Sequence, residues 1–189
     1  IFNEPQNIGL PKQFSYKKYL SKVLDQGADP ICVPCSLSAY INWDINVKEG
    51  SEKDNKVRVF DIFNNRGHDR EGMSFKQALK YTQKEGVKTS KGIYKINKYA
   101  KINSPLALKH ALILNGPCIG GLPVYDSMKT EFWNGNGNEY EGLHAVSIVG
   151  YNEDGFIIRN SWGLSYGDDG YAFISEKDVK KFTEIWTII

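Results

Sequence analysis

The chain has few cysteines, no long apolar run and almost no net charge. Its three cysteines cannot all pair with one another, which excludes a disulfide-rich scaffold and leaves at least one free thiol. No apolar stretch approaches the roughly 20 residues that span a bilayer, so we expect no membrane association. With 24 basic and 22 acidic residues, the net charge of +2 is too small to favour binding to nucleic acid or to an anionic surface.

The residues that are present suffice for a packed core. Of 189 residues, 41% are hydrophobic and 13% are aromatic. This length predicts one large domain or two small lobes that fold without metal or disulfide support. The sequence begins with Ile1 and shows no signal-peptide pattern, so we expect a processed or trimmed piece of a longer protein.

Helical signals dominate the first half of the chain. Apolar periodicity predicts three helices, over about 32–44, 74–86 and 104–116. Ser74 and Gln77 form a capping-box pattern, and Pro105 suits the first position of the third helix. Residues 54–67 are polar and mixed, and we make no assignment there.

From residue 116 onward, short apolar runs alternate with Gly, Asn and Asp. They predict strands at about 118–122, 145–151, 156–159 and 171–174. A turn at residues 152–155 joins two of these strands into a hairpin. We therefore expect a single α+β domain over 1–189, with a mainly helical lobe over 11–103 and a mainly β lobe over 104–189 that includes 1–10.

Three residues suggest nucleophilic catalysis. Cys32 opens a predicted helix, where the helix dipole favours a thiolate. His144 is expected at the head of a strand, where its ring can accept the thiol proton. Asn160 follows sixteen residues later on the neighbouring antiparallel strand, which brings it beside His144 to fix the ring. The order is nucleophile, base and orienting group.

These residues and the motifs around them resemble the papain-like cysteine peptidases. The shared motifs are Gln26-Gly27 before the nucleophile, His144-Ala145-Val146 followed by Gly150-Tyr151, Asn160-Ser161-Trp162-Gly163, and the glycine-rich stretch Gly163–Tyr171. The resemblance covers most of the chain and implies a papain-like two-lobed fold with the active site in the cleft. The stretches Leu10-Pro11 and Phe14-Ser15 resemble the start of a mature enzyme, which implies that any inhibitory pro-segment is absent from this chain.

Two cysteines compete for the role of nucleophile. In the family a Gln stands six residues before the attacking cysteine, and Gln26 stands six residues before Cys32. Cys35 would require an insertion, because it lies nine residues after Gln26. This register also places Ser36 where the family often has Ser. We therefore predict that Cys32 attacks and that Cys35 faces inward as a small apolar residue.

The resemblance implies a role for each matched residue. Cys32 and His144 would form a thiolate–imidazolium pair, and Asn160 would orient the imidazole while Trp162 shields their hydrogen bond from water. The Gln26 side-chain amide, with the Cys32 backbone N–H, would form the oxyanion hole. We expect the adjacent substrate-binding surface to include Gly72, Met73, Gly121 and Ala145.

Some residues depart from the family pattern. Val33 replaces the usual aromatic residue after the nucleophile, and Asp29 replaces the first cysteine of the family's Cys-x-x-Cys block, so the disulfide of that block is missing. His144 follows Cys32 by 112 residues, fewer than the ~130 that are usual for the family. We therefore expect the loops that restrict the cleft in exopeptidase members of the family to be absent.

We expect a monomeric hydrolase that cleaves peptide or protein substrates and needs no metal or other cofactor. Three alternatives stay open: a thiol–disulfide oxidoreductase that uses Cys32-Val33-Pro34-Cys35, a catalytically silent binding domain, and an acyl transferase of the same fold. The spacing of Cys32 and Cys35 also permits an inactivating disulfide. The compartment is unknown; the lack of a disulfide framework favours a cytoplasmic, microbial or viral setting.

Overall fold

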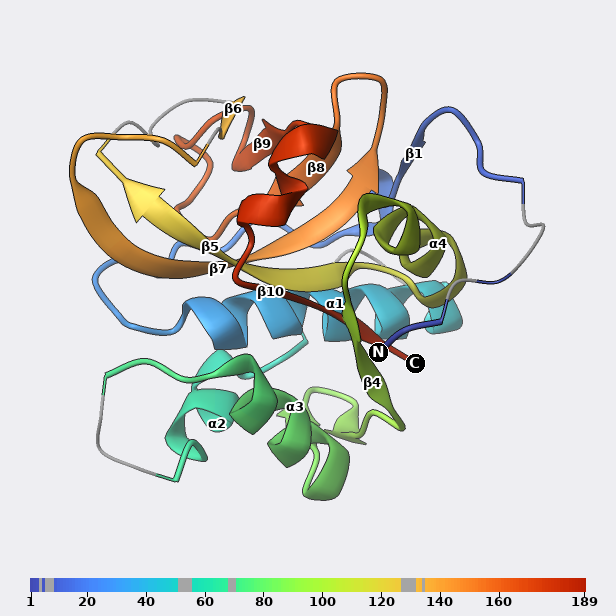
Figure 1. Ribbon diagram of the computed structural model, residues 1–189. Helices are drawn as coiled ribbons and strands as arrows, with labels where there is room; N and C mark the ends of the chain where they lie inside the picture. Colours follow the sequence, from blue (N-terminus) through green and yellow to red (C-terminus); the bar gives the residue numbers. More distant parts are fainter. Residues whose placement is uncertain (4, 6–8, 51–55, 68–70, 127–131, 134) are drawn as a thin grey trace.

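A computed structural model describes residues 1–3, 5, 9–50, 56–67, 71–126, 132–133 and 135–189. One large sheet and four α-helices make up most of the fold (Figure 1). The helices are α1 (Cys32–Glu49), α2 (Val59–Asn64), α3 (Phe75–Lys84) and α4 (Pro105–Asn115), and two 3₁₀ turns are η1 (Lys17–Tyr19) and η2 (Glu176–Lys181). No helix within the described ranges is both long enough and apolar enough to cross a membrane.

The large sheet has eight strands in the order β4-β10-β5-β7-β8-β9-β6, with β1 paired to β7. Its pairs are antiparallel except β6 with β9. The strands are β1 (Phe14–Ser15), β4 (Tyr99–Ile102), β5 (Cys118–Tyr125), β6 (Phe132–Trp133), β7 (Tyr140–Tyr151), β8 (Phe156–Arg159), β9 (Tyr171–Ile174) and β10 (Glu184–Ile188). A separate hairpin joins β2 (Val87–Thr89) to β3 (Gly92–Tyr94).

Local sequence signals explain where several elements begin and end. The Ser74 hydroxyl accepts a hydrogen bond from the Gln77 N–H and the Gln77 side chain accepts one from the Ser74 N–H, so the predicted capping box starts α3. Ser104 caps α4, and Pro105 is its first residue. The turn at 152–155 is closed by the Asn152 N–H donating to the Gly155 carbonyl at 2.9 Å.

The sequence analysis missed elements whose partners are distant in the chain. It made no assignment for α2, and it did not predict β10, which lies between β4 and β5. Two strands from the stretch expected to be helical, β1 and β4, belong to the large sheet. The boundary between two lobes at 103/104 stays a prediction.

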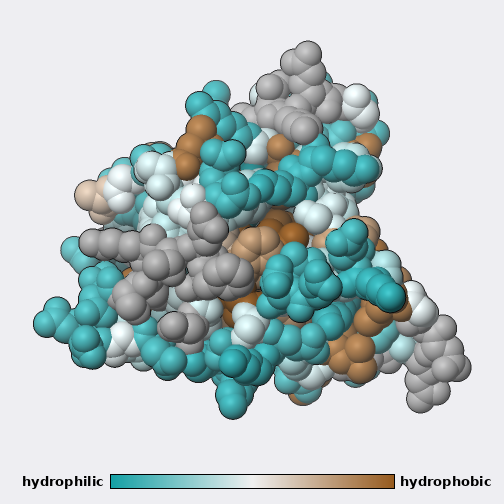
Figure 2. Space-filling view, turned by 90° about the horizontal axis from the view of Figure 1, so that it is seen from above, coloured by the Kyte–Doolittle hydropathy of each residue, from teal (hydrophilic) through white to brown (hydrophobic). Residues whose placement is uncertain are grey.

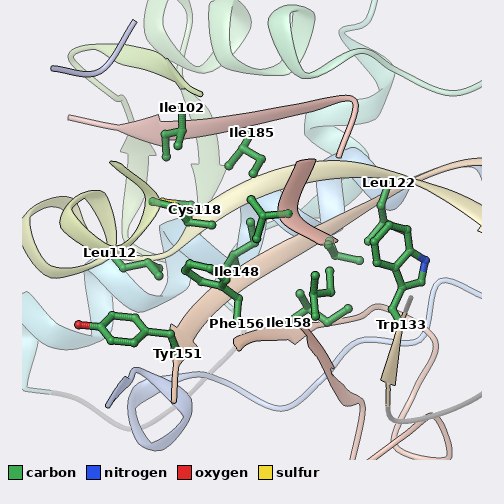
Figure 3. Close-up of a cluster of buried hydrophobic side chains, with 14 of the residues drawn as sticks. Ile102, Leu112, Cys118, Leu122, Trp133, Ile148, Tyr151, Phe156, Ile158 and Ile185 are labelled. Atoms are coloured by element: carbon green, nitrogen blue, oxygen red, sulfur yellow. The ribbon is translucent and has the colours of Figure 1, made fainter. Parts of the chain in front are cut away.

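Apolar side chains pack on both sides of the sheet. One cluster lies between α4 and the strands and includes Leu112, Cys118, Ile148 and Phe156 (Figure 3). A second cluster joins α1 and α3 to the sheet through residues such as Leu37, Leu79, Ile119, Ala145 and Trp186. Viewed from above, the molecular surface is mostly hydrophilic, with apolar surface in patches and in a central hollow (Figure 2). The second cluster holds α1 against β7.

Candidate active site

Cys32 is the first residue of α1, and its side chain is half-buried. No side-chain cap occupies the start of this helix, because Ile31 stands at the N-cap position. Burial raises the pKa of the Cys32 thiol, whereas hydrogen bonds from the backbone of Ala145 and Val33 act in the opposite direction. The Ala145 contact places the sulfur beside the strand that carries His144.

His144 lies on β7 and faces Asn160, which immediately follows β8. The His144 Nε2 atom is 2.7 Å from the Asn160 Oδ1 atom. Both side chains are buried. Burial lowers the pKa of His144 to about 4, and the hydrogen bond to Asn160 opposes this shift. The bond to Asn160 engages Nε2, so Nδ1 is the ring nitrogen that remains for exchange with a thiol.

One sequence expectation about His144 is wrong. The histidine does not lie at the head of its strand, because β7 begins at Tyr140 and His144 is opposite Leu122 of β5 in the sheet register. The strand is longer than predicted since its first residues pair with the end of β5, across a bulge. The expected closeness of His144 and Asn160 does not depend on this start, because the β7–β8 hairpin sets it.

An aromatic side chain covers the imidazole. The Trp162 ring stacks on the His144 ring, with centroids 4.5 Å apart and an interplanar angle of 26°. Tyr166 contacts Trp162 edge-on, with centroids 5.1 Å apart. The backbone of Trp162 is also held in place, because it forms a β-bridge with Asp25. Water is thereby kept from one face of His144.

The Gln26 amide is held at both of its polar atoms. Its Nε2 donates to the Asp29 carbonyl at 2.8 Å, and its Oε1 accepts from the Ser161 hydroxyl at 2.7 Å. The Gln26 backbone N–H donates to the Ser161 carbonyl at 2.8 Å. The segment that carries Gln26 is therefore joined directly to the segment that carries Asn160.

Arg159 strengthens the same junction. Its buried guanidinium donates to the Ser21 carbonyl at 2.6 Å, to the Lys22 carbonyl at 2.7 Å and to the Tyr171 hydroxyl at 3.2 Å. Two of these acceptors belong to the chain segment that leads to Gln26. The planar fork of an arginine can bind several acceptors at once, which a lysine ammonium cannot reproduce with fixed geometry.

Cys35 lies one turn after Cys32 and is only 5% exposed. Its neighbours include Ile31 and Phe63. Burial raises the pKa of the Cys35 thiol to about 12, so this thiol is protonated at neutral pH. It borders a cavity of about 10 Å³, which is large enough for about one water molecule and is lined also by Ser36, Ser147, Arg159, Asn160 and Ser161.

A larger cavity of about 420 Å³ opens beside Cys32 and His144. All four residues expected on the substrate-binding surface line it, namely Gly72, Met73, Gly121 and Ala145. The cavity is also lined by residues that the sequence analysis did not assign to the substrate-binding surface: Val33, Glu71, Ser74, Phe75, Leu143, Thr183 and Glu184. Thr183 and Glu184 stand at the start of β10, and no local motif marks them as part of a site.

Of the two acidic residues that line this cavity, Glu184 is already engaged. The Glu184 carboxylate accepts a hydrogen bond from the Trp186 indole at 3.0 Å and lies 3.4 Å from the Lys101 ammonium. Gly121 carries no side chain, and a Cβ added there would lie 2.9 Å from the Thr183 hydroxyl oxygen. The absence of this side chain keeps open the part of the cavity beside Thr183 and Phe75.

The site thus combines a thiol at a helix start, an imidazole bonded to an amide, and a second amide bonded to the residue that follows the first. Catalysis by a cysteine nucleophile generally requires a thiol, a base and a group that orients the base. The family model described as papain family cysteine protease matches residues 31–185. The chain belongs to this family, and its α+β fold is papain-like.

Curated relatives agree with this assignment over part of the chain. Peptidase 1 of Dermatophagoides pteronyssinus is 34% identical over 100 residues, which cover 49% of this chain and 30% of that protein. Probable cysteine proteinase 224L of Invertebrate iridescent virus 6 is 24% identical over 124 residues, covering 47% of this chain and 28% of that protein. The matched regions therefore span less than a third of either relative.

Solved structures show the same fold over nearly the whole chain. Xylellain, a cysteine protease from Xylella fastidiosa, superposes with a TM-score of 0.82 at 23% identity, covering 95% of this chain and 86% of that one. The proCathepsin B S9 of Trypanosoma congolense also gives a TM-score of 0.82, at 16% identity, covering 96% of this chain and 79% of that one. At these identities the likeness establishes the fold.

Proposed function

We propose that this chain is a cysteine peptidase that hydrolyses peptide bonds through a thioester intermediate. The observation that supports this most strongly is that Cys32 and His144 line one cavity, while the Asn160 oxygen lies 2.7 Å from Nε2 of that histidine. The family membership supports the same reaction class.

The first half of the reaction makes the acyl-enzyme. The Cys32 thiol passes its proton to His144, and the thiolate sulfur attacks the carbonyl carbon of the scissile bond. The negative charge that develops on the carbonyl oxygen is met by the Gln26 amide and the Cys32 backbone N–H. The His144 imidazolium then protonates the leaving amine, the C–N bond breaks, and a thioester remains.

The second half regenerates the enzyme. His144 takes a proton from a water molecule, and the resulting hydroxide oxygen attacks the thioester carbon. The C–S bond breaks, the carboxylic product leaves, and Cys32 returns to its starting form. Each cycle consumes one peptide bond and one water molecule, and no other reactant is needed.

Burial disfavours each charge of the Cys32–His144 pair when the charge is considered alone, since it raises the thiol pKa and lowers the imidazole pKa. The pair becomes favourable only because each charge compensates the other, helped by the helix dipole and the backbone of Ala145. This mutual dependence is part of the proposal and makes His144 necessary for thiolate formation.

Peptide cleavage by matched cysteine variants tests the function. The wild-type chain is expected to cleave a mixed peptide library and to bind one equivalent of an epoxide-type peptidyl inhibitor on Cys32. Cys32→Ala should abolish cleavage and labelling, whereas Cys35→Ala should retain most of both. An adduct located on Cys35 by mass spectrometry would overturn the choice of nucleophile, and equal loss in the two variants would favour the redox alternative.

The proposed partner is a peptide or protein substrate, and the proposed state is a monomer. Two of the similar solved structures, those of Trypanosoma congolense and of the ragweed pollen allergen Amb a 11, are proforms. We therefore propose that an inhibitory pro-segment can cover the cavity beside Cys32. Inhibition by an added pro-segment peptide would test it.

A further inference from the structure

The positive charges of this chain are distributed unevenly, although its net charge is small. Residues 76–101 contain eight of the 24 basic residues but only one of the 22 acidic residues, Glu85. All of these basic residues are lysines, and all of them are exposed. We propose that the part of this surface on α3 is a binding site for a linear sulfated polysaccharide, distinct from the peptidase site proposed above.

Three of these lysines form a single line along α3. Lys76, Lys80 and Lys84 are spaced by four residues, so their side chains lie one above the other on one face of the helix, over about 12 Å. We call these three residues the lysine stripe. The opposite face of α3, with Ala78 and Leu79, is buried in the second apolar cluster. Figure 1 shows α3 at the lower edge of the molecule, where this exposed face is accessible to a partner.

A fourth lysine extends the lysine stripe beyond the end of the helix. The Lys95 ammonium donates to the Lys84 carbonyl at 2.7 Å, which places it at the C-terminal end of α3. The segment that follows Lys95 is held against the helix as well, because the Gln83 side-chain amide donates to the Asn97 carbonyl at 2.6 Å. Four positive charges therefore lie along one edge of the molecule.

Few carboxylates oppose these four charges. Among the described residues, no carboxylate lies within ion-pair distance of Lys76, Lys80 or Lys95, and Lys84 pairs only with the exposed Glu85, at 3.2 Å. Like charges four residues apart on a helix repel each other, so the lysine stripe destabilises α3. A surface that concentrates charge of one sign attracts ions of the other sign. A polyanion is therefore the class of ligand that this surface fits.

The side chains near the lysine stripe favour a polysaccharide over other polyanions. Residues 76–101 contain no arginine, the side chain that binds bases and phosphates with two parallel hydrogen bonds. The aromatic residues of α3 are not exposed, since Phe75 is buried and Tyr81 is half-buried, so no ring is free to stack on a nucleic-acid base. A sulfated polysaccharide has no bases and needs only positive charges that recur along a line.

Binding of a fluorescently labelled heparin octasaccharide, measured by anisotropy at several salt concentrations, tests the inference. For four ion pairs, the plot of log K against log salt should have a slope of about −3. The variant Lys76→Gln/Lys80→Gln/Lys84→Gln removes three of these pairs. It should weaken binding about tenfold and reduce the slope to about −1.

A second triple variant is the matched control. Lys12→Gln/Lys18→Gln/Lys177→Gln removes the same number of charges from exposed positions outside residues 76–101 and should bind within about twofold of the wild type. Thermal unfolding of the stripe variant should occur no lower than that of the wild type, because the substitution relieves repulsion along α3. Weaker binding would then not result from unfolding.

Each other outcome has a definite meaning. Equal weakening in the two variants would show that net charge alone drives binding and would overturn the site. Tighter binding to single-stranded DNA of equal charge, or to vesicles that contain an anionic lipid, would overturn the choice of partner; the vesicles are included because Ile93 of β3 is 60% exposed. A chain that binds the octasaccharide through the lysine stripe but cleaves no peptide would support this inference and overturn only the proposed function.

Discussion

The Asn160 side-chain oxygen lies 2.7 Å from Nε2 of His144, at the junction of two neighbouring strands. An amide oxygen only accepts, so this contact requires a hydrogen on Nε2 and leaves Nδ1 as the basic nitrogen of a neutral ring. The tautomer of His144 is thereby fixed before any substrate binds. For the proposed reaction this matters because the other nitrogen must take the thiol proton.

His144→Ala is expected to shift the pH dependence of Cys32 alkylation upward. Burial raises the thiol pKa, and the imidazolium is the main group proposed to lower it, so its removal leaves burial to dominate. The measurement is the rate of iodoacetamide reaction from pH 4 to pH 10. A curve that coincides with that of the wild type would mean that the two groups do not form an ion pair.

The free energy of unfolding should depend on pH through His144 once the thiol is absent. Burial lowers the pKa of His144 from 6.5 to about 4 in the folded chain, and we expect this shift to persist in Cys32→Ala because the buried environment of the ring is unchanged. The unfolded state then binds more protons, so stability is full above about pH 6.5 and is lost as the pH falls to about 4, by up to about 3 kcal/mol. Chemical denaturation of Cys32→Ala and of Cys32→Ala/His144→Asn measures the difference. The same slope in both variants would refute the assignment.

Gly121→Ala should narrow the substrate cavity. The added Cβ would lie 2.9 Å from the Thr183 hydroxyl oxygen and 3.1 Å from a Phe75 ring carbon, and hydrogen bonds to the Gly121 carbonyl hold Thr183 in place. We expect kcat/KM to fall most for peptides with a large apolar side chain next to the scissile bond and least for those with Ala there. Gly9→Ala has open space around it and is the control. Equal losses across the peptide series would contradict this location of the binding pocket.

Trp162→Ala should lower kcat on the order of tenfold, because an aromatic pair contributes about 0.5–1.5 kcal/mol beyond area burial. The lost ring is the one stacked on His144 with centroids 4.5 Å apart. Trp162→Phe keeps a ring at the same place and should retain most of the rate. Steady-state kinetics and thermal unfolding of both variants are the measurements. An unchanged kcat in Trp162→Ala would show that the ring has only a packing role.

Local patterns predicted much of the fold, and long-range pairing explains what they missed. Ser74 with Gln77 marked the start of α3, and the turn at 152–155 marked the hairpin of β7 and β8, because both signals lie within a few residues. The strand β10 gave no such signal. Its residues pair with β4 and β5, which are far away in sequence, so its conformation is set by tertiary contacts.

The same distinction applies to the site. Cys32, His144, Asn160 and Gln26 could be named from spacing and from the family resemblance, since each stands in a local motif. The bond between Ser161 and Gln26 and the place of Thr183 in the cavity could not, because each depends on segments that meet only in the folded chain. The sequence names the reacting groups, whereas the folded structure shows what holds them.

The guanidinium of Arg159 has a consequence for how activity is lost on heating. It donates hydrogen bonds to the carbonyls of Ser21 and Lys22. Asn160 is the residue that follows Arg159 in the chain. Detachment of the segment that contains Ser21, Lys22 and Gln26 would therefore disturb the Gln26 amide and, through Asn160, the His144 imidazole in one cooperative event. Thermal inactivation should be all-or-none, with no partly active intermediate, and should precede or coincide with global melting.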